Sequence, residues 1–314
     1  MVRVESVSRW YDDFCAVDDV SFTIAQGEVV GLLGHNGAGK TTIMKMLTGF
    51  LQPDKGHITI NDLDIVDQPL YVKAGIGYLP ENLPLYPEMM VAEYLEYAAS
   101  LHGIKSARRM QAIKVAMSQT GLIEKATQII GTLSRGYKQR VGVAQAILHQ
   151  PNVLILDEPT NGLDPTQTQL MRELIGQLSK QSTVILSTHI LQEVDAVCDR
   201  VLILRNGRLV VDERLEVLGE THTLILKTDL KPDGVNNVTD ESQAFRLTES
   251  ISGNKYTEYH IQVSVKRDIG DAIAQLSQSI IQSGGRIFAV YPERHNLETV
   301  FREVNLGKEA DNHV

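Results

Sequence analysis

Three stretches of strand length are apolar at both odd and even positions. They lie at residues 28–33, 153–158 and 183–186, and the second ends in the acids Asp157 and Glu158. A strand with only one buried face would alternate apolar and polar residues, whereas parallel strands covered on both faces read as continuous apolar runs. The pattern therefore predicts an α/β fold with a sheet that is buried on both sides.

Other periodicities predict the elements around this sheet. Helical spacing of apolar residues indicates helices at 42–50, 91–101 and 107–117, and one that contains Val141–Ile147. Strand patterns occur at 2–7, 17–24, 57–60 and 75–80, and a hairpin joins 200–204 to 208–211 through Asn206 and Gly207. We therefore expect a mixed sheet, with a helical subdomain at about residues 82–150.

After residue 220 the chain changes character. Strands are predicted near 222–228, 243–248, 256–265 and 286–290, and helices at 269–281 and 296–304. Polar turns such as Lys231-Pro232-Asp233-Gly234 separate them. The predicted organisation is an α/β domain at 1–220, a small α+β domain at 221–306 and a frayed polar tail at 307–314.

Composition narrows the functional class. The chain has 314 residues, of which 43% are hydrophobic and 22% charged, as in ordinary globular proteins. Its formal charge of −9 argues against a nonspecific nucleic-acid binder. Two cysteines form neither a disulfide framework nor a metal-ligand cluster. No signal peptide or membrane span is predicted, so we expect a cytoplasmic protein whose work at a membrane depends on a spanning partner.

The segment Gly34-His35-Asn36-Gly37-Ala38-Gly39-Lys40-Thr41 fits the phosphate-loop pattern G-x-x-x-x-G-K-[ST]. It follows a predicted strand and precedes a predicted helix, as the motif requires. Glycines let the backbone wrap closely round a phosphate, and successive N–H groups with the helix N-terminus face the anion. Lys40 would reach the outer phosphates, Thr41 would ligate magnesium, and Thr42 follows within the same nucleotide site.

Further motifs resemble those of one family. Tyr11, the run "AVDDVSFTIAQGEVVGLLGHNGAGKTT" and Asp157-Glu158 resemble an ATP-binding cassette (ABC) ATPase. Residues 133–137 match three of the five positions of its L-S-G-G-Q signature, with Arg135 and Tyr137 departing from it. Residues 159–165 resemble its D-loop. Taken alone, Ser134 could be an ordinary N-cap, the two acids solvated loop charges, and His189 a structural histidine.

The resemblance covers essentially the whole chain and implies a P-loop ABC cassette that hydrolyses ATP with Mg²⁺. It implies that Tyr11 stacks on adenine, with Trp10 as the competing candidate. Asp157 would hold magnesium, Glu158 would polarise the attacking water, and His189 would sense the outermost phosphate. Two cassettes would sandwich two ATP molecules, and Ser134 and Gly136 of one chain would face the phosphates bound by the other.

One position departs from the family, and the stretch after it has two interpretations. The family usually has a glutamine at the hinge of the helical subdomain, where it touches magnesium and water, whereas this chain has Glu81. Its carboxylate could still accept from a metal-bound water, as part of the magnesium site, but it adds a negative charge beside the phosphates. The next residues, Asn82-Leu83-Pro84-Leu85-Tyr86-Pro87, form either a docking surface or a linker packed on the subdomain. We favour docking.

The resemblance also implies partners. A cassette without spans would pair with integral membrane permease subunits, at the inner face of the cell membrane. The run "GYLPENLPLYPEM" and the closing Leu297–Val304 helix resemble type-2 exporters, especially gliding-motility and multidrug-type cassettes. The rivals are a soluble ABC ATPase that does not transport and a small-molecule phosphotransferase. The small C-terminal domain would stabilise the dimer, regulate it or sense substrate.

Overall fold

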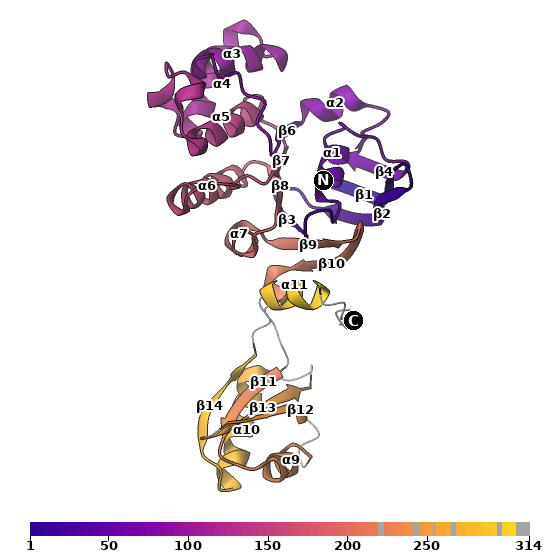
Figure 1. Cartoon of the computed structure of the whole chain (residues 1–314), viewed down its shortest axis with the longest axis vertical. Coiled ribbons are helices and arrows are strands. Elements are labelled where there is room, and N and C mark those ends of the chain that lie inside the picture. Colours follow the sequence, from indigo (N-terminus) through magenta and orange to yellow (C-terminus); the bar gives the residue numbers. More distant parts are fainter. Residues whose placement is uncertain (219–222, 241–244, 254, 265–267, 294–296, 306–314) are drawn as a thin grey trace. The chain divides into compact units, whose positions relative to one another are not determined.

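The structure is a computed structural model that describes residues 1–218, 223–240, 245–253, 255–264, 268–293 and 297–305. It separates the chain into two compact units (Figure 1). One contains Met1–Leu215 together with Glu303–Val314, and the other contains Glu216–Arg302. The division expected from the sequence placed the first boundary at 220/221 and assigned residues up to 306 to the second domain. The predicted tail at 307–314 lies outside the described residues.

The centre of the first unit is a six-stranded sheet with the order β10-β9-β3-β8-β7-β6. Its strands are β3 (Val29–Leu33), β6 (Ile76–Leu79), β7 (Val153–Asp157), β8 (Thr183–Thr188), β9 (Arg200–Arg205) and β10 (Arg208–Arg214). All neighbours are parallel except β9 and β10, which form the hairpin expected around Asn206-Gly207. Every residue of β3, β7 and β8 is buried, which confirms the strands predicted from continuous apolar runs.

A second sheet in this unit is antiparallel, with the order β2-β1-β4-β5. It consists of β1 (Val2–Tyr11), β2 (Phe14–Ile24), β4 (Lys55–Ile60) and β5 (Leu63–Asp64). Together with α1 (Lys40–Leu47) and α2 (Pro69–Ala74) it packs on one face of the parallel sheet. The mixed α/β architecture is therefore confirmed, and this core places α1 beside the end of β3.

Helices cover the other face of the parallel sheet. They are α3 (Val91–Leu101), α4 (Ser106–Gln119), α5 (Arg135–Ile147), α6 (Pro165–Leu178) and α7 (Leu191–Val197), with 3-10 turns at Ile123–Lys125 and Ile130–Thr132. Apolar side chains of α3 to α6 share one core with β7 and β8. The helices predicted at 91–101 and 107–117 are confirmed, whereas α2, α6 and α7 were missed.

The helix after the phosphate loop is shorter than predicted. Periodicity indicated residues 42–50, but α1 ends at Leu47, and Phe50 is 81% exposed instead of packed. Gly49 has φ +64° just beyond the helix, the left-handed conformation that commonly terminates one. Local turn chemistry thus overrides the apolar periodicity at this end.

The second unit has the order of elements β-α-β-β-α-β. It contains β11 (Thr223–Thr228), α9 (Pro232–Asp240), β12 (Phe245–Ser252), β13 (Thr257–Val263), α10 (Ile269–Gln282) and β14 (Ile287–Pro292). The strands form one antiparallel sheet with the order β12-β13-β11-β14, which is the split β-α-β arrangement. The predicted α+β class of this part is confirmed.

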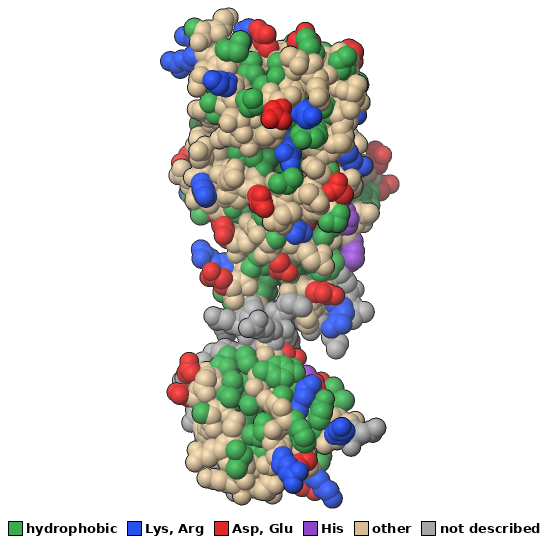
Figure 2. Space-filling view, turned by 90° about the vertical axis from the view of Figure 1, so that its left-hand side faces the viewer, with side chains coloured by type: hydrophobic (Ala, Val, Ile, Leu, Met, Phe, Trp, Pro, Cys, Tyr) green, Lys and Arg blue, Asp and Glu red, His purple; other side chains and the backbone are tan. Residues whose placement is uncertain are grey.

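One turn predicted in this unit is wrong. Lys231–Gly234 was expected to be a polar turn, but α9 begins at Pro232, because proline suits the first position of a helix. Val235 and Val238 of α9 and three residues of α10 pack on one face of the sheet. Elsewhere the unit exposes apolar rings, including Phe288 at 53%, and hydrophobic side chains gather on its surface in Figure 2.

Two short helices lie at the limits of this unit. Helix α8 covers Leu215–Leu218, and α11 covers Leu297–Asn305, which confirms the helix predicted at 296–304 apart from residue 296, which lies outside the described residues. The last residues of α11 belong to the first unit, where the Arg205 guanidinium donates a hydrogen bond to the Val304 carbonyl oxygen.

Candidate functional site

The predicted phosphate loop connects β3 to α1, as the motif requires. Two glycines are dictated by its geometry. Gly39 has φ +105°, and a Cβ added at Gly34 would lie 2.7 Å from the Leu204 carbonyl oxygen. His35, Asn36 and Gly37 are exposed, whereas Ala38 is buried. The sequence therefore folds into a tight turn at the carboxyl end of a parallel strand, where α/β sheets bind their ligands.

Lys40 folds back over this turn. Its Nζ donates hydrogen bonds to the carbonyl oxygens of Gly34 at 2.6 Å and His35 at 3.3 Å, and the residue is buried. Burial lowers the pKa of Lys40, and the negative charges of Glu158, Asp157 and Glu81 oppose that shift. The ammonium group therefore lies near three carboxylates that come from two different strand ends. Thr41, the next residue, is exposed, and Thr42 is half-buried.

Asp157 ends β7 inside the sheet. The Ser187 hydroxyl, from the neighbouring strand β8, donates a hydrogen bond to its carboxylate. Burial raises the pKa of Asp157, the Ser187 hydrogen bond lowers it, and the charge of Glu81 raises it further. A cation beside this carboxylate would offset both the burial and the like charge. Sequence reasoning missed Ser187, because nothing in the pattern distinguishes it from other residues of β8.

Glu158 turns sharply out of the same strand. Its φ is +50°, uncommon for a residue with a side chain, and its backbone N–H donates to the Ser187 carbonyl oxygen at 3.1 Å. The turn brings the carboxylate to His189, whose Nδ1 lies 3.0 Å from Oε1 and 2.9 Å from Oε2. Burial raises the pKa of Glu158, and the hydrogen bond and charge of His189 oppose the shift. Two residues predicted as catalytic thus form one pair.

A buried acid that the sequence did not indicate lies behind this pair. Glu193 on α7 is 3% exposed and accepts hydrogen bonds from the hydroxyls of Thr160 and Thr188, the second at 2.7 Å. An acid in the first turn of a helix is common, so the sequence gives no reason to single out Glu193. Only folding brings α7 against the ends of β7 and β8.

Glu81, which stands where the family has glutamine, follows β6. It is exposed, and Asn161 of the predicted D-loop donates a hydrogen bond from Nδ2 to its Oε1 at 3.4 Å. The hinge carboxylate is therefore linked to the loop that follows Glu158. Its charge also acts on Lys40 and Asp157.

The residues of the predicted signature begin α5. Ser134 is the N-cap, and its hydroxyl oxygen accepts from the Tyr137 N–H at 3.5 Å. Gly136 is buried, and a Cβ added there would lie 2.5 Å from the Gln167 side-chain oxygen, so a larger residue would displace that side chain. Ser134 is exposed, as a hydroxyl that binds a ligand outside its own chain must be. Its capping role and a ligand-binding role are compatible.

Tyr11, the predicted adenine-stacking residue, ends β1 and lies outside any loop. Its side chain is 42% exposed, and the Arg9 guanidinium lies 5.4 Å from the ring centroid. Trp10, the competing candidate, is half-buried, and the Lys55 ammonium lies 5.1 Å from its ring centroid. Tyr11 is the more accessible of the two rings.

The proline-rich stretch after Glu81 combines both expected behaviours. Leu83 and Leu85 are half-buried and pack on the core of the helical layer, as a linker would. Tyr86 is 44% exposed, and its ring centroid lies 5.7 Å from that of Tyr97. Of the three large apolar side chains in this stretch, Tyr86 is thus the exposed one.

The residues proposed for magnesium fit that ion in their chemistry. Thr41 and Asp157 offer oxygen donors, which hard cations prefer, and Mg²⁺ usually takes one or two protein ligands with substrate phosphates and waters. No group of three His, Cys, Asp or Glu residues that could enclose a metal occurs in the part of the chain that the structure describes. A site completed by nucleotide phosphates is consistent with both observations.

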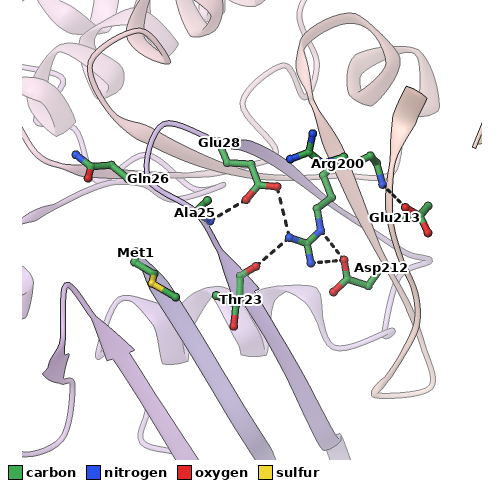
Figure 3. Close-up of a pocket in the computed structure, with 9 residues that line it drawn as sticks. Met1, Thr23, Ala25, Gln26, Glu28, Arg200, Asp212 and Glu213 are labelled. Carbon is green, nitrogen blue, oxygen red and sulfur yellow. Dashed lines mark hydrogen bonds and ion pairs between the residues drawn. The ribbon is translucent and has the colours of Figure 1, made fainter. Parts of the chain in front are cut away.

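A pocket of about 720 Å³ lies away from these residues (Figure 3). Arg200 reaches across it to Glu28, Asp212 and the Thr23 carbonyl oxygen. Glu28 directly precedes β3, and Arg200 begins the parallel strand β9. The pocket therefore lies at the amino ends of these strands, whereas the phosphate loop follows the carboxyl end of β3. Arg200 is thus paired with both Glu28 and Asp212 across the pocket.

Comparison with known proteins identifies the family. Residues 17–161 match the model of the family described as ABC transporter. The chain is 39% identical over 227 residues to the ABC transporter ATP-binding protein NatA of Bacillus subtilis, covering 70% of this chain and 92% of that protein. It is 30% identical over 305 residues to the bacitracin transport ATP-binding protein BcrA of Bacillus licheniformis, covering 96% of each.

A solved structure supports the fold. The dimeric structure of a bacterial ABC transporter cassette matches with a TM-score of 0.61 and 24% identity, covering 68% of this chain and 99% of that one. None of the described helices is long and apolar enough to span a membrane. On its similarity to NatA and BcrA, the chain belongs to the ABC transporter family and is one of its ATP-binding cassette ATPases.

Proposed function

We propose that this chain hydrolyses Mg²⁺-bound ATP and that Glu158 activates the attacking water. The observation that carries the proposal is the pairing of Glu158 with His189 beside the phosphate loop. A carboxylate with a raised pKa accepts a proton more readily than an ordinary one. His189 holds that carboxylate in one orientation and supplies a group able to respond to the outermost phosphate.

Other residues of the site would bind the substrate. The backbone of residues 34–39 faces the phosphates, and Lys40, already near the loop, supplies positive charge to the outer ones. Thr41 and Asp157 would hold the magnesium ion, with Glu81 near its shell. The ion would neutralise charge on the transferring phosphoryl group. Tyr11 would stack on the adenine ring.

The arrangement also supports a head-to-tail dimer of cassettes. Ser134 and Gly136 at the start of α5 would bind the phosphates held by a second copy, because a helix N-terminus attracts anions, and of these two residues Ser134 is the exposed one. Asp164, the N-cap of α6, would lie at the dimer contact. A cassette of the same fold has been solved as a dimer, which supports this assembly.

Transport is proposed from the family and from one surface. NatA and BcrA are named as ATP-binding proteins of transporters, and BcrA as one that transports bacitracin. We infer that this chain drives export through separate integral membrane subunits at the inner face of the cell membrane. Tyr86, which is exposed five residues after the hinge residue Glu81, would contact such a subunit.

Two measurements test this function. The purified chain should release phosphate from ATP only with a divalent cation, and Lys40→Ala should abolish the release. Affinity purification from solubilised membranes of its own cells should recover an integral membrane protein. Recovery of an active ATPase without a membrane partner would favour a soluble, non-transport ABC ATPase. A phosphorylated small molecule without release of free phosphate would instead identify a phosphotransferase.

A further inference from the structure

The loops that carry Glu158 and His189 are joined by a third residue. Glu193 is almost fully buried, and each of its two carboxylate oxygens accepts a hydrogen bond from a different threonine. Thr160 lies two residues after Glu158, and Thr188 directly precedes His189. The same carboxylate therefore contacts both segments within two residues of the proposed water-activating pair.

Both threonines are buried, and the direction of the Thr188 hydroxyl is fixed by a second hydrogen bond. Thr188 is fully buried, and its oxygen also accepts the Ile190 N–H at 3.1 Å, so its proton is directed at Glu193. Thr160 is 5% exposed. Buried hydroxyls and carboxylates without partners are costly, which fixes all three groups in this arrangement.

Glu193 itself has a fixed position. The next residue, Val194, packs on the parallel sheet so closely that a Cβ on Gly31 would lie 3.0 Å from a Val194 methyl carbon. Gly31 lies in β3, the strand that leads into the phosphate loop. Helix α7 is thus held against the strand that positions the nucleotide site, and Glu193 transmits that position to the two loops.

We propose that Glu193 is a positioning residue for ATP hydrolysis, which holds Glu158 and His189 in register through Thr160 and Thr188. This inference rests on the proposed function, since it concerns the residues assigned to water activation. Removing the carboxylate frees both loops but leaves the phosphate loop and Lys40 intact. Turnover should therefore fall while affinity for ATP is retained.

The test compares variants of the full chain in steady-state ATPase assays. Glu193→Ala should lower kcat at least tenfold, with KM for ATP within threefold of wild type. Glu193→Gln should recover kcat to within threefold, because its carbonyl oxygen can accept from the Thr188 hydroxyl while its amide N–H donates to the Thr160 oxygen. Asp195→Ala serves as the matched control, because Asp195 is an exposed acid on the same helix, and it should leave both constants unchanged.

Several outcomes would overturn the inference. A Glu193→Ala variant with kcat within twofold of wild type would do so, as would equal losses in Glu193→Ala and Glu193→Gln. If Glu193→Ala does not fold, Thr160→Val and Thr188→Val replace it, and wild-type kcat in both overturns the inference. A wild-type chain that hydrolyses no ATP would defeat the proposed function and this inference together, whereas active alanine variants would defeat this inference alone.

Discussion

The Nδ1 atom of His189 lies 2.9 and 3.0 Å from the two carboxylate oxygens of Glu158, although 31 residues separate them in the chain. Each residue follows the end of a parallel strand, and β7 and β8 are neighbours in the sheet. The positive φ of Glu158 turns its side chain toward the histidine. This relationship turns two separate motifs into one site and underlies the first prediction.

Glu158→Gln should retain ATP binding but lose hydrolysis by about two orders of magnitude or more, because only proton acceptance is removed. An ATP-dependent dimer should accumulate. Phosphate release and size-exclusion chromatography with ATP or ADP provide the measurements. Near wild-type turnover would show that another group activates the water.

Glu81→Gln should change kcat or its dependence on magnesium, with little effect on nucleotide affinity. The carboxylate acts on Lys40 and Asp157 and accepts a hydrogen bond from Asn161, so its charge influences the proposed metal site. ATPase rates across magnesium concentrations provide the measurement, with Asn82→Ala, an exposed neighbour, as the control. Unaltered kinetics at every concentration would reduce Glu81 to a hinge residue.

Tyr86→Asp should preserve folding and basal ATPase activity but abolish assembly with the membrane subunit. Tyr86 and Tyr97 are both exposed with ring centroids 5.7 Å apart, and clustered aromatic side chains on a surface are typical of protein contacts. Leu85→Asp is expected to destabilise the chain by roughly 1–3 kcal/mol, because Leu85 packs on the helical core. The docking interpretation is therefore wrong for Leu85, which is half-buried, and stays a prediction for the exposed Tyr86.

Thermal unfolding of the purified variants and recovery of the partner in detergent separate these two effects. A Tyr86→Asp chain that folds and still assembles and transports would place the docking surface elsewhere. One that unfolds by itself would assign Tyr86 to the core.

Acidification should destabilise the wild-type chain more than His149→Gln. His149 stacks on His102 with ring centroids 4.1 Å apart, and its Nε2 lies 3.0 Å from the Ile76 carbonyl oxygen. Burial lowers the pKa of His149 to about 4, with the charge of His102 as a smaller cause. In the unfolded chain a histidine binds its proton near pH 6.5, whereas His149 in the folded chain stays neutral down to about pH 4. The neutral His149 therefore contributes its full stability above pH 6.5, and that contribution declines as the pH falls toward 4.

The melting temperature at pH 7.5 and pH 5 measures this effect. Between these two pH values the melting temperature should fall further in the wild type than in His149→Gln. The difference should be roughly 2–4 °C for each kcal/mol by which protonation of His149 lowers the free energy of unfolding. His57→Gln, in which an exposed histidine is replaced, should behave as wild type. Equal decreases in wild type and His149→Gln would contradict the linkage.

The local sequence determined those features that depend on neighbouring residues. Continuous apolar runs specify β3, β7 and β8, because a strand buried on both faces lacks the alternation of apolar and polar residues that a half-exposed strand shows. The spacing of glycines with Lys40 and Thr41 specifies a phosphate loop, since the chain must turn closely round an anion. These arguments need no knowledge of distant parts of the chain.

Tertiary structure decided what depends on residues far apart. The bond of Asn161 to Glu81, the hydroxyl of Ser187 at Asp157 and the burial of Glu193 between two threonines follow from the order of strands in the sheet. That Leu85 packs on the core while Tyr86 is exposed likewise depends on how the helical layer packs around them. Periodicity along a chain cannot determine such contacts, because it records the burial of a residue but not which residues surround it.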